Sequence, residues 1–326
     1  MKTIAHIKNH LSAQKISFIL GLFFFFSCSE KSKKTKTITV DYDKVDTFFG
    51  ADVSQILFDH LYIVLDSVSY AKLTQNTFFK DTYVAIDKGF PNFETIDEKT
   101  ASCYARGHKH YIEILGPNNQ YQEPVGKSGI AFSLYNKGEH FHLGVKPKLK
   151  KNETTYLSIS ETVDVPLDQH EITWFKAFYS PSKNTNLNTW YAFYNPTFLD
   201  SLHQLKHQGY TREAFLQKSY KKECLFKDIK RISMDCTIDD YNRIAQEMRY
   251  LGCNLLNVEN KVLTIASGDV LIRIRPSETI EYSRITEIQC RLNALDNSVI
   301  QLGNLTITNK GKESLWNFDN LNKTIN

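Results

Sequence analysis

The feature that most constrains the fold is one order of elements that recurs along the chain. The stretch FDHLYIVLD, residues 58–66, alternates apolar and polar side chains and predicts a strand. A segment with helical spacing follows at 70–81, and then three further strand-like runs. The same order of strand, helix and three strands restarts at Gly129 and again at Lys230. This recurrence predicts an α+β fold of repeated βαβββ modules, in which curled mixed sheets pair around a shared cup.

The recurrence divides the chain into six segments. We expect a helical connector between the second and third modules, and a third module that is degenerate and ends in closing strands. Within it, Asp239 or Asp240 is the expected N-cap of a helix, and a hairpin turns at Ser267 and Gly268. The expected boundaries are 1–27 for a signal peptide, 28–55 for a tether, 56–128 for the first module, 129–200 for the second, 201–229 for the connector and 230–326 for the third.

The N-terminal segment has the pattern of a bacterial lipoprotein signal. Three lysines precede or flank an apolar stretch, Ile16–Phe26, that is shorter than the roughly 20 residues a membrane span needs. Ser27 then precedes Cys28 and a lysine-rich run, which resembles a lipobox, where the cysteine is acylated and becomes the new N-terminus. We expect lipidation at Cys28 and, because Ser29 follows, an anchor in the outer membrane of a Gram-negative cell envelope. The alternatives are an ordinary secretory signal cut nearby and a short buried helix.

Composition excludes several classes of function. Three of the 40 lysines and arginines lie in the signal peptide, which leaves 37 basic against 36 acidic residues and no case for nucleic-acid binding. Five cysteines follow Cys28 and none forms a C-x-x-C pair, so zinc ribbons and thioredoxin-like sites are excluded. The odd number leaves at least one thiol free or paired between chains, and Cys236 with Cys253 is the candidate bridge.

Three stretches carry a resemblance to a known superfamily: the first-strand His60, the run YIEILGP at 111–117, and GKSGIAF at 126–132, which opens the second module. With the βαβββ order, they resemble the glyoxalase-like modules of the vicinal oxygen chelate superfamily, and in particular glyoxalase-like lipoproteins of Gram-negative bacteria. The resemblance covers residues 56–136 and extends more weakly over 137–308. It implies paired modules with a divalent metal in the cup, held by residues of the first and fourth strands.

Carried over residue by residue, the resemblance implies that His60 and Glu113 are the metal ligands. Alternation along the fourth strand puts Tyr111 and Glu113 on one face, so that His60 and Glu113 can meet in one cavity. Tyr62 and Tyr111 are then expected to contact a ligand.

The later modules do not complete a set of metal ligands. Alignment puts Gly129 and Ala192 opposite the two implied ligands, and the third module has Arg231 and Arg273 there. A divalent ion takes about four to six donors, and two protein ligands rarely suffice. The cofactor prediction is therefore either none or a divalent metal. In the alternative reading, the imidazole and the carboxylate bond to each other or to a bound polar molecule.

Other polar runs offer weaker candidates. Arg273 and Arg275 could form an anion-binding floor, with a solvated face of paired charges as the alternative. His108 and His110 fall on the opposite side of the strand from Glu113 and are expected in solvent or a loop. The run GKS at 126–128 lacks the earlier glycine of a phosphate-binding loop, and no nucleophile motif is present.

Three classes of function fit these residues. The first is a lipid-anchored envelope protein whose cup binds a small polar ligand without chemistry. The second is a divalent-metal enzyme of the lyase, isomerase or dioxygenase type, in which Glu113 could also act as a base. The third is an interaction scaffold that presents Trp174, Trp190 and Tyr191 to another envelope protein. The incomplete ligand set favours the first, whose expected partners are membrane lipid through Cys28 and a small molecule.

Overall fold

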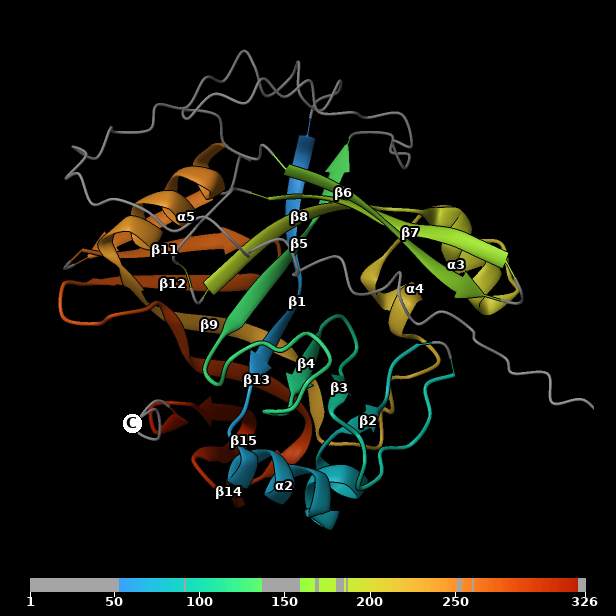
Figure 1. The fold of residues 1–326 in the computed structure, drawn as a ribbon, viewed down its shortest axis with the longest axis horizontal. Coiled ribbons are helices and arrows are strands. Elements are labelled where there is room, and N and C mark those ends of the chain that lie inside the picture. Colours follow the sequence, from blue (N-terminus) through green and yellow to red (C-terminus); the bar gives the residue numbers. More distant parts are fainter. Residues whose placement is uncertain are drawn as a thin grey trace, which may run out of the picture.

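The computed structural model describes residues 53–90, 92–136, 159–167, 170–179, 185, 187–250, 254–259 and 261–321. The predicted signal peptide, the lipidation site Cys28 and most of the tether lie outside these residues. Within them, the chain forms an eight-stranded and a seven-stranded mixed sheet, both curled and unclosed, which confirms the α+β class (Figure 1). None of the helices in these ranges has the length and apolar character that a bilayer crossing requires.

The first module has the predicted element order. Asp66 begins its helix by accepting a hydrogen bond from the backbone N–H of Ser69 at 2.9 Å. Its first strand starts at Val53, inside the predicted tether, because that end pairs with the second module. The elements are β1 (Val53–Val64), α2 (Ser67–Gln75), a π-helical turn η1 (Phe79–Tyr83), β2 (Ala85–Asp87), β3 (Ser102–Arg106) and β4 (Tyr111–Leu115).

The second module completes the first sheet. Its strands are β5 (Ser128–Asn136), β6 (Ile159–Leu167), β7 (His170–Tyr179) and β8 (Leu187–Tyr194); residues 137–158, where a helix or loop was expected, lie outside the described ranges. The sheet runs β2-β3-β4-β1-β5-β8-β7-β6, so β1 and β5 pair antiparallel at its centre. His60 pairs with Ala131 and Tyr62 pairs with Gly129, a register that is compatible with the alignment of His60 with Gly129 made from the sequence.

A third module and three closing strands form the second sheet, in the order β10-β11-β12-β9-β13-β15-β14. The sequence pattern does not predict β10, which gives the third module the full order of strand, helix and three strands. The hairpin between β11 and β12 is confirmed, and Gly268 turns it with a φ of 62°. The elements are the connector helices α3 (Pro196–His203) and α4 (Arg212–Leu216), then β9 (Phe226–Thr237), α5 (Ile238–Tyr250), β10 (Asn254–Glu259), β11 (Val262–Ser267), β12 (Val270–Ser277), β13 (Arg284–Asp296), β14 (Val299–Leu302) and β15 (Leu305–Asn317).

One local prediction in the third module is corrected, and another stays a prediction. The hydroxyl of Thr237 accepts a hydrogen bond from the N–H of Asp240 at 3.3 Å, so Thr237 caps α5 and both aspartates lie in its first turn. Cys236 is a free, buried thiol, and its suggested partner Cys253 lies outside the described residues. The Cys236 side chain faces the hydrophobic core from β9, where it acts as a small apolar group.

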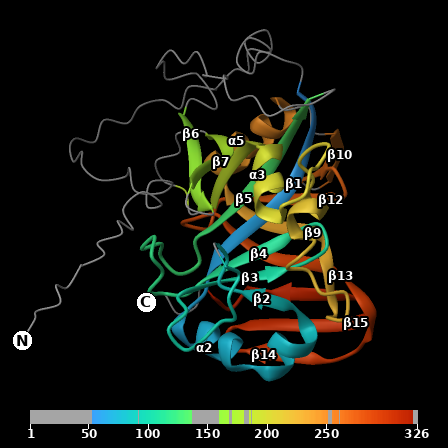
Figure 2. The ribbon, with the colours of Figure 1, turned by 90° about the vertical axis from the view of Figure 1, so that its right-hand side faces the viewer.

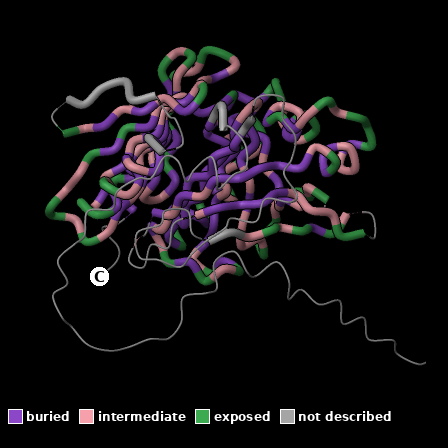
Figure 3. Tube along the Cα trace, turned by 90° about the horizontal axis from the view of Figure 1, so that it is seen from above, coloured by how far each residue is buried: buried purple, intermediate pink, exposed green. Residues whose placement is uncertain are grey.

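The two sheets pack face to face around one hydrophobic core. Leu61 of β1 and Ile232 of β9 belong to the same buried cluster. Across the interface, the indole N–H of Trp316 donates to the hydroxyl of Tyr83 at 2.7 Å. In Figures 1 and 2, α2 lies at one end of this core and α5 at the other, and buried residues follow the strands through its centre in Figure 3.

We call the face of the first sheet that points away from the second sheet the site face. A second buried cluster, contributed by β4, β7, β8, α3 and α4, covers part of it. Its rings include Phe90, which lies 4.9 Å from Trp174 and 5.6 Å from Phe198 between ring centroids. The connector helices therefore bury the outer side of the sheet beside the predicted site.

Candidate functional site

A β-bulge in β1 places two neighbouring polar residues on the site face. The register against β5 shifts between Phe58 and His60. Phe58 belongs to the core between the sheets, whereas the ring of His60 stacks on Tyr111 of the site face. The extra residue of the bulge, Asp59, breaks the strict alternation that the sequence suggests.

Asp59 orients the His60 imidazole. One carboxylate oxygen lies 2.7 Å from Nδ1 of His60, and the other accepts a hydrogen bond from the Ser133 hydroxyl at 2.5 Å. Burial raises the pKa of Asp59, but the hydrogen bond and charge of His60, with the Ser133 hydroxyl, bring that pKa below its usual range. An ionised carboxylate takes its hydrogen bond from Nδ1–H, so the neutral imidazole has its lone pair on Nε2.

Aromatic rings hold the imidazole from two sides. The rings of His60 and Tyr111 stack with centroids 4.2 Å apart and planes 11° apart, and Trp190 approaches His60 edge-on at 5.4 Å. Tyr62 lies beside Trp190 at 6.0 Å and accepts a hydrogen bond from the Asn188 amide at 2.8 Å. The predicted ligand contacts Tyr62 and Tyr111 therefore do lie next to His60.

Glu113 shares this face with His60. In the parallel pairing of β1 with β4, His60 lies opposite Tyr111 and Tyr62 lies opposite Glu113. The hydroxyl of Tyr104 donates to the Glu113 carboxylate at 3.0 Å. Burial raises the pKa of Glu113 above its ordinary value, and the nearby His60 opposes that rise. The structure thus brings the predicted pair to one side of the sheet, although no hydrogen bond joins the two described side chains.

A cation already sits against the tyrosines next to Glu113. The guanidinium of Arg106 lies 4.6 Å from the ring centre of Tyr104 and 5.0 Å from that of Tyr111. Two hydrogen bonds of 2.8 Å join it to the carboxylate of Asp87. The positive charge of Arg106 is therefore balanced by Asp87.

The described residues supply only part of the implied divalent-metal site. A side chain at position 129 would require the neighbouring rings to move, because a Cβ atom on Gly129 would lie 2.3 Å from the ring of Tyr62 and 2.7 Å from that of Trp190. With His60 aligned to Gly129, Tyr62 corresponds to Ala131, and the strand registers then put Trp190 rather than Ala192 at the position that corresponds to Glu113. In the part of the chain that the structure describes, no group of three or more His, Cys, Asp or Glu side chains could hold a metal ion.

Arg273 and Arg275 do not belong to this site. Both are exposed on the outer side of the second sheet, because the intervening Ile274 faces the core between the sheets. Arg275 is joined to Asp235 by hydrogen bonds of 2.7 and 2.8 Å. The two arginines therefore lie away from His60, on the outer side of the second sheet, and their predicted role in an anion-binding floor stays a prediction.

His110 is buried rather than solvated. Its side chain is 0% exposed, because the side of the strand opposite Glu113 packs against β9 of the second sheet. The backbone N–H of Ile229 donates to Nδ1 of His110 at 3.2 Å, and a guanidinium nitrogen of Arg212 lies 2.8 Å from Nε2. Burial lowers the pKa of His110 and favours the neutral ring. His110 thus joins β4, β9 and α4.

The aromatics proposed for an interaction scaffold are not free surface residues. Tyr191 is 0% exposed. Trp174 and Trp190 are partly buried and pack against the cluster that covers the site face. The sequence shows their abundance but not their burial, because rings serve cores as readily as interfaces.

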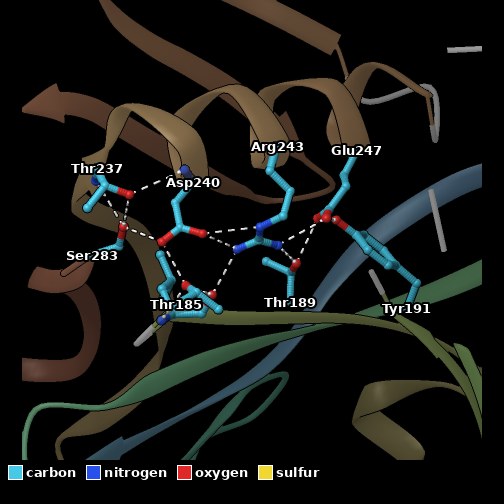
Figure 4. A network of polar contacts seen from close by, with 9 residues as sticks. Thr185, Thr189, Tyr191, Thr237, Asp240, Arg243, Glu247 and Ser283 are labelled. Carbon is cyan, nitrogen blue, oxygen red and sulfur yellow. Dashed lines mark hydrogen bonds and ion pairs between the residues drawn. The ribbon is translucent and has the colours of Figure 1, made fainter. Parts of the chain in front are cut away.

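A polar network ties α5 to the first sheet (Figure 4). Arg243 donates to Asp240 at 2.9 Å and to Glu247 at 3.0 Å. Thr189 and Tyr191 of β8 donate to the other oxygen of Glu247 at 2.7 and 2.6 Å. Because the charges of this network pair with one another, it fixes how the two sheets dock.

Sequence reasoning missed Asp59 and Trp190 as members of the site. Asp59 stands directly before His60, but an unbroken strand would turn their side chains to opposite faces. Only the bulge, which strand alternation cannot reveal, places the carboxylate against the imidazole.

Comparison with known proteins identifies the chain at the level of a family. No curated protein matches it. Among solved structures, a hypothetical protein from Staphylococcus aureus is 13% identical, with 70% of this chain and 88% of that chain covered and a TM-score of 0.43. A xylose isomerase-like TIM barrel/4-hydroxyphenylpyruvate dioxygenase fusion protein is 10% identical, with 71% of this chain and 36% of that chain covered and a TM-score of 0.39. Residues 58–318 match a family of unknown function (DUF5829), to which this chain therefore belongs.

Proposed function

We propose that the chain is a membrane-anchored envelope lipoprotein that binds a small polar ligand on the site face, within a glyoxalase-like arrangement of βαβββ modules. One observation carries the binding proposal: Asp59 orients His60 so that Nε2 can accept a hydrogen bond, beside Glu113 on the same face. Among the described residues, none donates to that Nε2. An acceptor, a carboxyl group and ring surfaces are the usual constituents of a small-molecule site.

Thermal-shift measurements on the full chain test this proposal. The panel contains small carboxylates, amines, amides and sugars, and we expect at least one class to raise the melting temperature, because a ligand of the native state stabilises it. Asp59→Asn and His60→Gln should each reduce the shift. His108→Gln, a partly exposed histidine next to Tyr220, is the control and should leave it unchanged. No shift with any class, or shifts that survive both site substitutions, would overturn the proposal.

A divalent-metal enzyme of the lyase, isomerase or dioxygenase type is the second candidate. The contact between Asp59 and His60 favours it, because metal-ligating histidines commonly donate their other N–H to a carboxylate. The test is the metal content of the full chain after incubation with zinc, manganese and iron and removal of free ions. Stoichiometric metal that His60→Ala loses would support this candidate, whereas a metal-free protein of unchanged stability would exclude it.

The anchor is proposed from the sequence around Cys28. We expect cells that express the full chain to incorporate labelled palmitate into it, and Cys28→Ala to abolish the label. Fractionation should then find the labelled protein in the outer membrane, as Ser29 suggests. An unlabelled, soluble wild-type protein would rule the anchor out.

A further inference from the structure

The Glu113 carboxylate lacks a positive partner among the described residues. The Glu113 carboxylate accepts a hydrogen bond from the neutral hydroxyl of Tyr104. The two nearby groups that can be positive are already engaged, since Arg106 is bound by Asp87 through two hydrogen bonds and His60 is held by Asp59. Partial burial destabilises the ionised carboxylate, and a bound cation would offset that cost.

Aromatic side chains surround this carboxylate. Tyr62 of β1 and Tyr104 of β3 are the strand partners of Glu113, and the Tyr104 hydroxyl donates to its carboxylate at 3.0 Å. Tyr111 precedes Glu113 by two residues on the same face of β4. Tyr121 and Trp190 also pack against the small cluster formed by Tyr62, Val64 and Leu115. Ring faces attract cations, and rings combined with a carboxylate form the cages that recognise ammonium groups.

The same face contains one cation that is held by aromatic rings and a carboxylate. Arg106 lies over the rings of Tyr104, Tyr111 and Phe93, at 4.6, 5.0 and 5.3 Å, and is neutralised by the carboxylate of Asp87. Glu113, on the adjacent strand β4, is a second carboxylate beside aromatic rings. Among the described residues, no lysine or arginine forms an ion pair with it.

We propose that Glu113, with the rings of Tyr62, Tyr121 and Trp190, binds a small organic ammonium ion. The inference rests on the proposed function and names the chemical class of its ligand. The ammonium group lies against the Glu113 carboxylate and the neighbouring rings. Nε2 of His60 accepts an N–H from a ligand that carries one.

The affinity for such a cation depends on pH in a defined direction. Burial raises the pKa of Glu113, while His60, Tyr104 and Arg106 oppose the rise. The cation binds the ionised carboxylate, so the affinity increases as pH rises through that pKa and levels off above it. The surrounding tyrosines stay neutral over this range because burial raises their pKa values as well.

The experiment is calorimetric titration of the full chain with methylammonium, trimethylammonium and choline, and with 3,3-dimethylbutan-1-ol as an uncharged isostere of choline. We expect at least one of the three ammonium ions to bind. If choline binds most tightly of the three, the uncharged alcohol should bind at least tenfold more weakly than choline. Glu113→Gln, which keeps the shape and the contact with Tyr104, should weaken binding at least tenfold and remove its pH dependence. Glu313→Gln, a carboxylate on the second sheet, is the matched control and should bind as the wild type does.

Tyr121→Leu provides a second variant in a loop, in case Glu113→Gln folds poorly; it should weaken ammonium binding without abolishing the fold. Absence of binding by all three ammonium ions, or binding that Glu113→Gln leaves unchanged, would overturn the inference. If carboxylates or sugars stabilise the protein through His60 in the thermal-shift panel while these cations do not bind, the proposed function stands and only the ammonium assignment fails.

Discussion

At the scale of single residues, the site depends on two exceptions to strand regularity. Asp59 occupies a bulge, which lets its carboxylate reach His60 and the Ser133 hydroxyl. Gly129 has no side chain, which lets the rings of Tyr62 and Trp190 close over β5 beside His60. The first exception orients the His60 imidazole, and the second makes room for an aromatic surface beside it.

Asp59→Asn should destabilise the protein in a way that depends on pH. The pKa of Asp59 is lowered in the folded state, so its ionised form stabilises the fold above the unfolded value of about 3.9 and loses that effect as pH falls through the folded pKa. At pH 7 we expect the free energy of unfolding to fall by about 1–3 kcal/mol. The difference from the wild type should shrink below about pH 4. Urea unfolding at pH 7, 5 and 3.5 measures it, and a difference that grew on acidification would contradict the assignment.

Gly129→Ala tests the closure of the rings. The new methyl group would meet the rings of Tyr62 and Trp190 at 2.3 and 2.7 Å, so they must shift. Overpacking of this kind costs about 1–3 kcal/mol of unfolding free energy. Gly209→Ala is the matched control, because a Cβ there meets nothing within 4 Å. Equal stability of the two variants in urea would show that the rings do not pack as described.

At the scale of elements, α5 is the part whose sequence least reveals its role. Its apolar residues Ile244 and Met248 face the core, as helical spacing predicts. Its charged residues do not all face solvent: Glu247 is 0% exposed and is bound by Arg243 and by two hydroxyl groups of β8. Helix α5, which follows β9 of the second sheet, is therefore hydrogen-bonded to β8 of the first sheet. Because hydrogen bonds are directional, they favour one docking geometry of the two sheets.

Arg243→Ala should be among the most destabilising changes of a charged residue. It leaves the carboxylates of Asp240 and Glu247 buried without their cation, and breaking a buried pair in this way costs about 3–5 kcal/mol. Arg275→Ala, which breaks an exposed pair with Asp235, is the control and should cost about 0–1 kcal/mol. Chemical unfolding of both variants at pH 7 measures the difference. A loss below about 1 kcal/mol for Arg243→Ala would mean that solvent or rearranged side chains satisfy the carboxylates.

At the scale of the whole molecule, the two sheets share one core and should unfold together. Trp316 of the second sheet is fully buried and hydrogen-bonded to Tyr83 of the first module, whose hydroxyl also contacts Ser314. Asn304 similarly reaches Asp66 at the start of α2 with a contact of 3.1 Å. Neither sheet can lose its inner layer without exposing the inner layer of the other.

Trp316→Ala should therefore weaken both sheets. Removal of a buried tryptophan costs about 3–5 kcal/mol. Hydrogen exchange should show faster opening of amides in β1 and β4 as well as in β13 and β15. Leu295→Ala is the control, because Leu295 is 74% exposed. It should change the free energy of unfolding by less than about 0.5 kcal/mol. Unchanged protection of β1 and β4 in Trp316→Ala would show that the sheets open independently.

The sequence by itself determined the order of elements and the faces that single strands present. Alternation around His60 and Glu113 predicted that both project to one side, and the parallel register of β1 and β4 agrees. The hairpin at Gly268 followed from turn chemistry in the same way. These features depend on neighbours in the sequence, whose periodicity a reader of the chain can count.

Only the tertiary structure decided which side chains are partners. The bulge that joins Asp59 to His60 arises from the β1–β5 pairing, and the β5–β8 pairing brings Trp190 to the His60 site. The burial of His110 requires β9 and α4, segments more than 100 residues away. The physical reason is common to all three: a residue's burial, charge balance and contacts are set by elements that approach from distant parts of the chain, and periodicity within one element carries no information about them.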